Sequence, residues 1–306
     1  MAIATTIIPI FAIIALGWIA NVKGFLPAEF IGPANRLVYY WAIPAMIFRS
    51  IYQGSFKILF NPTVLAISLV CLSMVFFIAW LTGIFSRIKK IQLGSFIQSS
   101  FHGNLGYIGL AVSYYYLETD GFVKAGIMAG FIMILQNFLA VVILQIYSGE
   151  ASIKMTLKSV LSGILANPVI ISAMAGIFVS LFEFNIPIVI DNILKILSGM
   201  ALPLALILIG STLSFKLISR HILPVLFSCA LKLVLLPGAG LIMFIIFEEN
   251  PKDYLPGLIL LASPTATLVY VMAQETKNDT DFAVAVISMS TLLSGFTVAF
   301  WIMLAA

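Results

Sequence analysis

Long apolar runs separated by short polar connections fill most of the 306-residue chain. Each run is about 20 residues long, which is the length that a helix needs to cross the hydrocarbon core of a bilayer. The ten runs are residues 2–20, 31–51, 62–85, 94–117, 124–147, 158–182, 192–213, 221–247, 254–275 and 281–304. This pattern predicts an all-α membrane protein with ten transmembrane helices, numbered here as segments 1 to 10. A membrane β-barrel would instead show shorter stretches of alternating polarity.

Composition agrees with this prediction and narrows the function. Hydrophobic residues make up 62% of the chain and charged residues 9%, against roughly 45–50% and about 25% in a soluble domain. The short connections leave no room for a soluble catalytic domain, so we expect no enzyme and no cofactor. Cys71 and Cys229 lack the spacing of a metal site, and no basic run indicates a nucleic-acid partner. We expect the N-terminal run to be the first span and not a cleaved signal.

Lysine and arginine residues are distributed unevenly among the connections. The odd-numbered connections carry nine of them and the even-numbered connections carry four. Short loops rich in these residues remain on the cytoplasmic side of a membrane. The bias therefore predicts that the odd connections face the cytoplasm and that both termini lie outside it.

The two halves of the chain resemble each other at a nearly constant spacing. Pro44 in segment 2 and Pro203 in segment 7 are 159 residues apart, and the prolines near the start of segments 3 and 8 are 162 residues apart. Weak internal symmetry of this kind is typical of repeats in membrane transport proteins. Because each half contains an odd number of spans, the second half must enter the bilayer in the opposite direction. We therefore predict two inverted five-helix repeats, residues 1–148 and 157–306.

Segment 4 contains an unusual central motif. Its sequence is His102-Gly103-Asn104-Leu105-Gly106-Tyr107-Ile108-Gly109. Glycine inside a helix costs about 1 kcal/mol relative to alanine. Three glycines so close together favour either local unwinding or a very close helix contact.

Segment 9, the partner of segment 4 in the repeat, is interrupted by Ser263-Pro264-Thr265. Proline removes a backbone hydrogen bond inside a helix. Paired interruptions in the two halves are typical of a midplane binding site, where the N-termini of half-helices attract an anion. The alternative is that the glycines only form a packing seam and that the proline only kinks a helix.

Ionisable residues inside the spans favour an anionic substrate. The acidic residues all lie in connections or at span ends, so the usual carboxylate for proton or sodium coupling is missing. Lys232 lies near the middle of segment 8 and is either part of the substrate site or a support for a broken helix. His102 is expected to pack or to form hydrogen bonds beside the break, and Gln136 to form hydrogen bonds between helices. Asn167 precedes Pro168 as an N-cap would.

With these motifs in view, the chain resembles the auxin efflux carrier family. This family contains prokaryotic relatives of the plant PIN-formed auxin carriers and permeases for malate and other organic acids. The most specific matches are Asn104-x-Gly106-Tyr107-x-Gly109-Leu110 and Pro264-x-Ala266 followed by Tyr270 and Ala273. One departure is Ala111, which stands where the family usually has proline. It leaves open whether segment 4 is fully broken.

The resemblance implies a fold shared with sodium/proton antiporters and bile-acid symporters. Segments 1, 2, 6 and 7 would form a scaffold, and segments 3–5 and 8–10 would form a transport domain that moves as an elevator. Broken segments 4 and 9 would cross, and Asn104 would contact a substrate carboxylate. The expected substrate-binding residues are Asn104, Gly103, Gly106, Tyr107, Gly109, Ser263, Pro264 and Thr265, and the expected supporting residues are Lys232, Gln136, Asn167 and His102.

The sequence is consistent with two functions. The first is a secondary carrier of a small organic anion, such as an auxin-like acid, malate or another carboxylate, in the bacterial inner membrane. It would be a homodimer joined through the scaffold helices. The second is a membrane receptor or accessory protein that keeps the fold without transport. An intramembrane hydrolase is disfavoured, because the chain has no HExxH motif and no serine nucleophile elbow.

Overall fold

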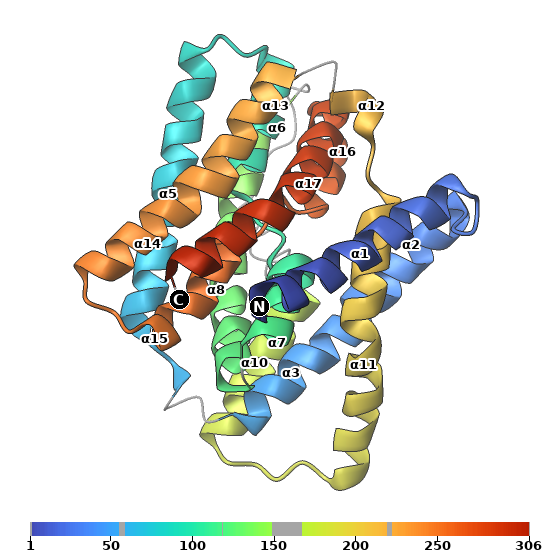
Figure 1. The fold of residues 1–306 in the computed structure, drawn as a ribbon, viewed down its shortest axis with the longest axis vertical. Helices are drawn as coiled ribbons and strands as arrows, with labels where there is room; N and C mark the ends of the chain where they lie inside the picture. Colours follow the sequence, from blue (N-terminus) through green and yellow to red (C-terminus); the bar gives the residue numbers. More distant parts are fainter. Residues whose placement is uncertain (1, 55–58, 118, 149–166, 219–221, 306) are drawn as a thin grey trace.

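A computed structural model describes residues 2–54, 59–117, 119–148, 167–218 and 222–305. Over these residues the regular structure is helical throughout, apart from one isolated antiparallel bridge between two extended segments. The predicted all-α class is therefore confirmed. Figure 1 shows a bundle of tilted helices, with α5, α13 and α14 on one flank and α1, α2, α3 and α11 on the other.

Six helices in the described part of the chain are long and apolar enough to cross a membrane. They correspond to segments 1, 3, 5, 7, 8 and 10, and the helix of segment 8 contains one π-helical turn, η3. Their bounds are α1 (Ala2–Val22), α5 (Pro62–Phe85), α8 (Thr119–Ile146), α11 (Ile188–Ser211), the continuous run of α13 (Ile222–Ala230), η3 (Leu231–Leu235) and α14 (Leu236–Ile246), and α17 (Thr280–Ala305).

The other four segments also contain helices, although none is among these six. Segment 2 is a continuous run with a π-helical turn, segments 4 and 9 are each split in two, and part of segment 6, residues 158–166, lies outside the described residues. The bounds are α2 (Ala28–Leu37), η1 (Val38–Ala42) and α3 (Ile43–Gln53); α6 (Lys90–Phe101), η2 (Leu105–Gly109) and α7 (Leu110–Tyr116); α10 (Pro168–Leu181); and α15 (Pro251–Ala262) and α16 (Leu268–Glu275). A short helix, α12 (Phe215–Ile218), joins segments 7 and 8. The ten-span inverted repeat stays a prediction.

Two helix pairs pack closely through glycine. Gly17 of α1 lies directly against the backbone of Ile207 in α11, where a side chain would not fit. In a second pair, a Cβ on Gly176 of α10 would come within 3.1 Å of the carbonyl oxygen of Phe48 in α3. Gly17 and Gly176 are 159 residues apart, which is also the spacing of the proline pair in segments 2 and 7.

A partly buried ion pair joins α3 to α11 at the ends of these helices. The guanidinium of Arg49 donates to both carboxylate oxygens of Asp191, over 2.9 Å and 3.2 Å. Tyr52 donates a further hydrogen bond to the same carboxylate. Asp191 thus gathers three side chains, including Gln53, and fixes α3 against the first turn of α11.

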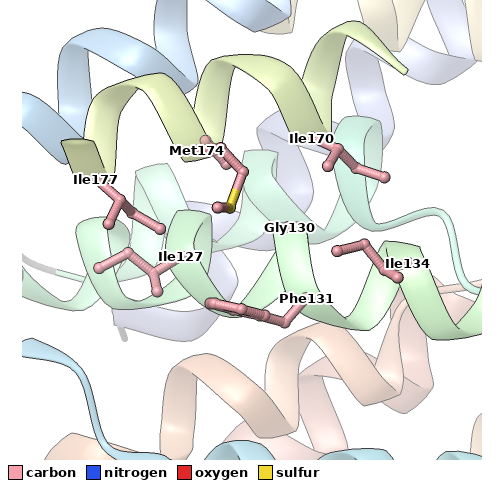
Figure 2. A pocket seen from close by; sticks show the side chains of 8 residues that line it. Ile127, Gly130, Phe131, Ile134, Ile170, Met174 and Ile177 are labelled. Atoms are coloured by element: carbon pink, nitrogen blue, oxygen red, sulfur yellow. The ribbon is translucent and has the colours of Figure 1, made fainter. Parts of the chain in front are cut away.

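A shallow groove runs between α8 and α10, and Figure 2 shows side chains of both helices lining it. The lining consists entirely of nonpolar residues: Ile127, Gly130, Phe131, Ile134, Ile170, Ala173, Met174 and Ile177. At its base a Cβ on Gly130 would meet the Cβ of Ala173 at 3.1 Å. Because none of the residues that line it is polar, this groove offers no group that could recognise a charged ligand.

Candidate functional site where segments 4 and 9 meet

Segment 4 is broken between Phe101 and Leu105. The backbone of His102 (φ −77°, ψ 97°) leaves the helical region, and Asn104 (φ −79°, ψ 65°) brings the chain back into η2. Segment 4 is thus fully interrupted, although Ala111 stands where the family that the sequence resembles usually has proline. None of the glycines in the motif has positive φ. Gly103 is instead required by close approach, because a Cβ there would lie 2.7 Å from the Ser263 hydroxyl oxygen.

Segment 9 is broken directly after α15. Ser263 adopts an extended conformation (φ −60°, ψ 144°), and helix resumes only at Leu268. Pro264 has no N–H to donate to the carbonyl of Leu260 one turn earlier. That carbonyl accepts from the backbone N–H of Ser263 at 3.2 Å and from its hydroxyl at 2.7 Å. Ser263 therefore satisfies the group that proline leaves unpaired.

The two breaks lie side by side and pair through their backbones. The N–H of Asn104 donates to the carbonyl of Pro264 at 2.7 Å, and the N–H of Ala266 donates to the carbonyl of His102 at 3.0 Å. Gly103 lies opposite Thr265 in this antiparallel bridge. We call residues 102–104 and 263–267 the crossing. It joins segments that are about 160 residues apart in the sequence.

Side chains from neighbouring helices satisfy the outer edges of the crossing. Gln136 of α8 accepts from the N–H of Gly103 at 3.1 Å and donates to its carbonyl at 3.2 Å. Ser290 of α17 accepts from the N–H of Thr265 at 3.1 Å, and the Thr265 hydroxyl donates to the carbonyl of Ser99 at 2.9 Å. These bonds stabilise unwound backbone at a depth where water cannot. Gln136 thus holds the unwound backbone at Gly103. The carbonyl of Ser99, which accepts from Thr265, was not predicted from the sequence.

Asn104 combines a structural role with an open donor. Its side-chain oxygen accepts from the N–H of Tyr107 at 3.3 Å and so caps η2. Its amide nitrogen Nδ2 is buried and has no hydrogen-bond partner among the described residues, and the residue is 5% exposed. An unpaired buried donor costs about 1–3 kcal/mol. A group that accepts from this nitrogen would recover that cost.

The helix ends around the crossing create a polar field in an apolar surrounding. η2 and α16 begin at the crossing, whereas α6 and α15 end there. A helix N-terminus carries roughly half a positive charge, and its first N–H groups lack partners within the helix. Two such N-termini together with the Nδ2 group of Asn104 form a setting that favours an anion.

Lys232 of η3 lies beside the crossing and is 0% exposed. Its amine nitrogen donates to the carbonyl of Leu261, in the last turn of α15, at 2.7 Å. Its Cε would lie 3.3 Å from a Cβ on Gly103. Among the described residues, no acidic side chain forms an ion pair with Lys232, unlike Arg49 with Asp191 and Lys124 with Asp253 near helix ends. This contact with α15 is the one expected of a support for the broken helix, and a part of Lys232 in the substrate site stays a prediction.

The other predicted residues occupy different positions around the crossing. The hydroxyl of Tyr107 lies 3.4 Å from the side-chain oxygen of Asn35 in α2. His102 is buried, with Nδ1 3.4 Å from the amide nitrogen of Gln98, and its ring stacks on Phe101. These contacts agree with the packing role expected for His102.

Gly109 and Gly106 differ in the space around them, and Asn167 lies at the start of α10. A Cβ on Gly109 would meet Leu260 at 3.0 Å, whereas one on Gly106 would meet only the flexible end of Met133 at 3.3 Å. Asn167 caps α10, because its side-chain oxygen accepts from the N–H of Val169 at 2.9 Å. The cap was predicted, but the contacts recorded for Asn167 are with its own helix and not with the crossing.

The hydroxyls of Ser263 and Thr265 both donate to backbone carbonyls, so a substrate contact through them stays a prediction. Over the described ranges, no group of three or more His, Cys, Asp or Glu side chains could hold a metal ion. The chemistry that the described residues offer at the crossing is hydrogen bonding and charge.

Comparison with known proteins identifies the class. The sequence profile of a family described as "Membrane transport protein" matches residues 2–302. The chain therefore belongs to this family, the auxin efflux carrier family, and is an integral membrane transport protein and not an enzyme.

Three relatives illustrate the range of the family. An "Uncharacterized transporter" of Methanothermobacter thermautotrophicus is 24% identical over 306 residues, covering 98% of each chain. A protein of Rhizobium meliloti named "Putative malonate transporter" is 25% identical, covering 95% of this chain and 92% of the relative. "Uncharacterized transporter YfdV" of Escherichia coli K12 is 24% identical, covering 97% and 95% respectively.

Proposed function

We propose that this protein is a secondary carrier of a small organic anion and that the crossing is its substrate site. The observation that carries the proposal is the Nδ2 group of Asn104, a buried donor without a partner in the described structure. It lies where two half-helices begin, and no acidic side chain pairs with the nearby Lys232 among the described residues. A carboxylate would accept from Nδ2 and balance the positive field.

The substrate class follows from the same chemistry. A carboxylate accepts hydrogen bonds from an amide and from unpaired backbone N–H groups without any proton transfer. The name of the Rhizobium meliloti relative adds a small dicarboxylate, malonate, to the candidates malate and an auxin-like acid. We propose a monocarboxylate or dicarboxylate of this size as the transported anion.

We further propose that transport follows an elevator mechanism in a ten-span inverted repeat. Segments 1, 2, 6 and 7 would be the static scaffold, and segments 3–5 and 8–10 would move with the crossing. The repeat is supported by helices at each of the ten apolar runs and by the spacing of 159 residues between Gly17 and Gly176, each at a close helix contact. The apolar groove between α8 and α10 would then lie between the moving and the static parts.

We also propose a homodimer joined through the scaffold helices, with both termini outside the cytoplasm. The outward faces of α1 and α11 carry exposed apolar residues such as Leu16 and Ile196, which suit either lipid or a second copy. Disulfide crosslinking of a cysteine at position 196 in native membranes would detect the copy. A monomer at every protein density would contradict it.

Flux in reconstituted vesicles tests the carrier function. Purified protein in proteoliposomes should take up radiolabelled malonate, malate or indole-3-acetate and should show counterflow when vesicles are loaded with the same acid. Asn104→Ala should abolish most of the flux. A protein that binds one of these acids but shows neither uptake nor counterflow would instead be the receptor considered above.

A further inference from the structure

The two half-helices that end at the crossing are capped by groups of different charge. In the last turn of α15, the carbonyl of Leu261 accepts from the amine of Lys232 at 2.7 Å. In the last turn of α6, the carbonyl of Ser99 accepts from the neutral hydroxyl of Thr265 at 2.9 Å. Only one of the two ends therefore has a cationic group as its side-chain partner in the described structure.

A cationic group at this position neutralises the partial negative charge at the end of α15. A helix C-terminus carries roughly half a negative charge and several unpaired carbonyls. In membrane carriers, half-helix C-termini and unwound carbonyls commonly coordinate a sodium ion or a proton. The amine of Lys232 contacts its carbonyl at the distance of a strong hydrogen bond, is fully buried, and is tethered to η3.

The repeat shows that the lysine belongs to one half only. At the spacing of 159–163 residues that relates the halves, the position matching Lys232 falls within 69–73 of α5, and none of those residues is charged. Other groups near the amine are neutral or already paired: the Ser263 hydroxyl donates to Leu260, and Gly103 has no side chain. His102, at the end of α6, pairs with Gln98. The lysine at the end of α15 therefore has no charged counterpart at the matching position of the first half.

We propose that the ammonium of Lys232 is a resident cation, which takes the place that a dissociable monovalent cation would occupy at the end of α15. Anion binding at the crossing then needs no sodium or potassium from solution. The statement about anion binding rests on the proposed carrier function, whereas the statement about the cation does not. The cation site can be examined without any substrate.

Thermal unfolding in detergent tests the site directly. Lys232→Ala, which leaves a cavity, is compared with Lys232→Met, which fills the same space without charge. Each is melted in sodium, potassium, methylammonium and choline chloride at equal ionic strength, and choline serves as the cation too large to enter. We expect sodium or methylammonium to raise the melting temperature of the alanine variant, while wild type and the methionine variant melt alike in all four salts.

A matched control is Lys124→Ala, which removes a lysine that forms an ion pair with Asp253 near the first turns of α8 and α15. Its melting temperature should not depend on which monovalent cation is present. A dependence equal to that of Lys232→Ala would be a general salt effect and would overturn the proposal. An alanine variant that melts identically in all four salts would overturn it as well.

Anion affinity gives an independent readout, with malonate as the probe. In choline chloride, Lys232→Ala and Lys232→Met should bind malonate about tenfold more weakly or worse, and Lys232→Arg should bind nearly as wild type does. Methylammonium should restore binding to the alanine variant only. If the alanine variant cannot be purified, the methionine and arginine variants decide. Full malonate affinity in Lys232→Met would refute a resident cation. A sodium requirement for malonate binding in wild type would refute it as well. If wild type binds no organic anion at all, the proposed carrier function fails, and the melting data still decide the cation site.

Discussion

The two side-chain atoms of Asn104 have separate roles, and two substitutions distinguish them. The oxygen caps η2 by accepting from Tyr107, whereas the nitrogen Nδ2 is buried without a partner in the described structure. Asn104→Asp keeps an oxygen acceptor for the cap but replaces the donor by negative charge. Asn104→Ala removes both groups. If Nδ2 binds the substrate, both variants lose affinity, and only alanine also loses the cap.

The expected magnitudes follow from these contacts. A hydrogen bond to a charged group contributes about 1.5–3 kcal/mol, so Asn104→Ala should weaken anion binding roughly 10- to 150-fold at about 1.4 kcal/mol per decade. Asn104→Asp should be worse, because it adds repulsion between like charges. Loss of the N-cap costs about 0.5–2 kcal/mol. The melting temperature should therefore fall for alanine and remain near that of wild type for aspartate.

Calorimetric titration of purified protein with malonate, malate and indole-3-acetate gives the affinities, and thermal unfolding of the same samples gives the stabilities. The control is Asn250→Asp, because the side-chain oxygen of Asn250 caps α15 at its far end by accepting from Lys252 at 3.0 Å. It should change neither quantity. Affinity in Asn104→Asp within about twofold of wild type would refute the reasoning and leave Asn104 as a cap alone.

Four further predictions test the crossing, the topology and the mechanism. Gly103→Ala forces a Cβ to 2.7 Å from the Ser263 hydroxyl and should destabilise the protein by about 1–3 kcal/mol, whereas Gly106→Ala should be tolerated; equal melting temperatures would contradict the close approach at Gly103. Uptake should persist when sodium is replaced by choline, because no mid-membrane carboxylate is present to hold it; strict sodium dependence would contradict this. A cysteine added after Ala306 should react with an impermeant maleimide in intact cells, and labelling only after lysis would reverse the topology. Ala173→Phe, which fills the groove against Gly130, should slow uptake without lowering malonate affinity, and unchanged uptake would remove the groove from the moving interface.

The positions of the helices and of their interruptions could be predicted from the sequence, because they depend on local properties. A span of about 20 apolar residues is a requirement of bilayer thickness alone. Glycine and proline weaken a helix wherever they occur, so Gly103 and Pro264 could be marked as candidate break points without a structure. The cap at Asn167 was predicted for the same reason, since capping involves only the next few residues.

Contacts between distant residues were decided by the tertiary structure. No local pattern says that Asn104 pairs with Pro264, that Gln136 holds Gly103, or that Lys232 reaches Leu261. The sequence marked the glycines of segment 4 as sites of unwinding or of close contact, and the structure assigns Gly103 to both, with ordinary φ. The reason is that burial without water requires each unwound backbone group to find a partner, and only packing of the whole chain determines which partner lies within reach.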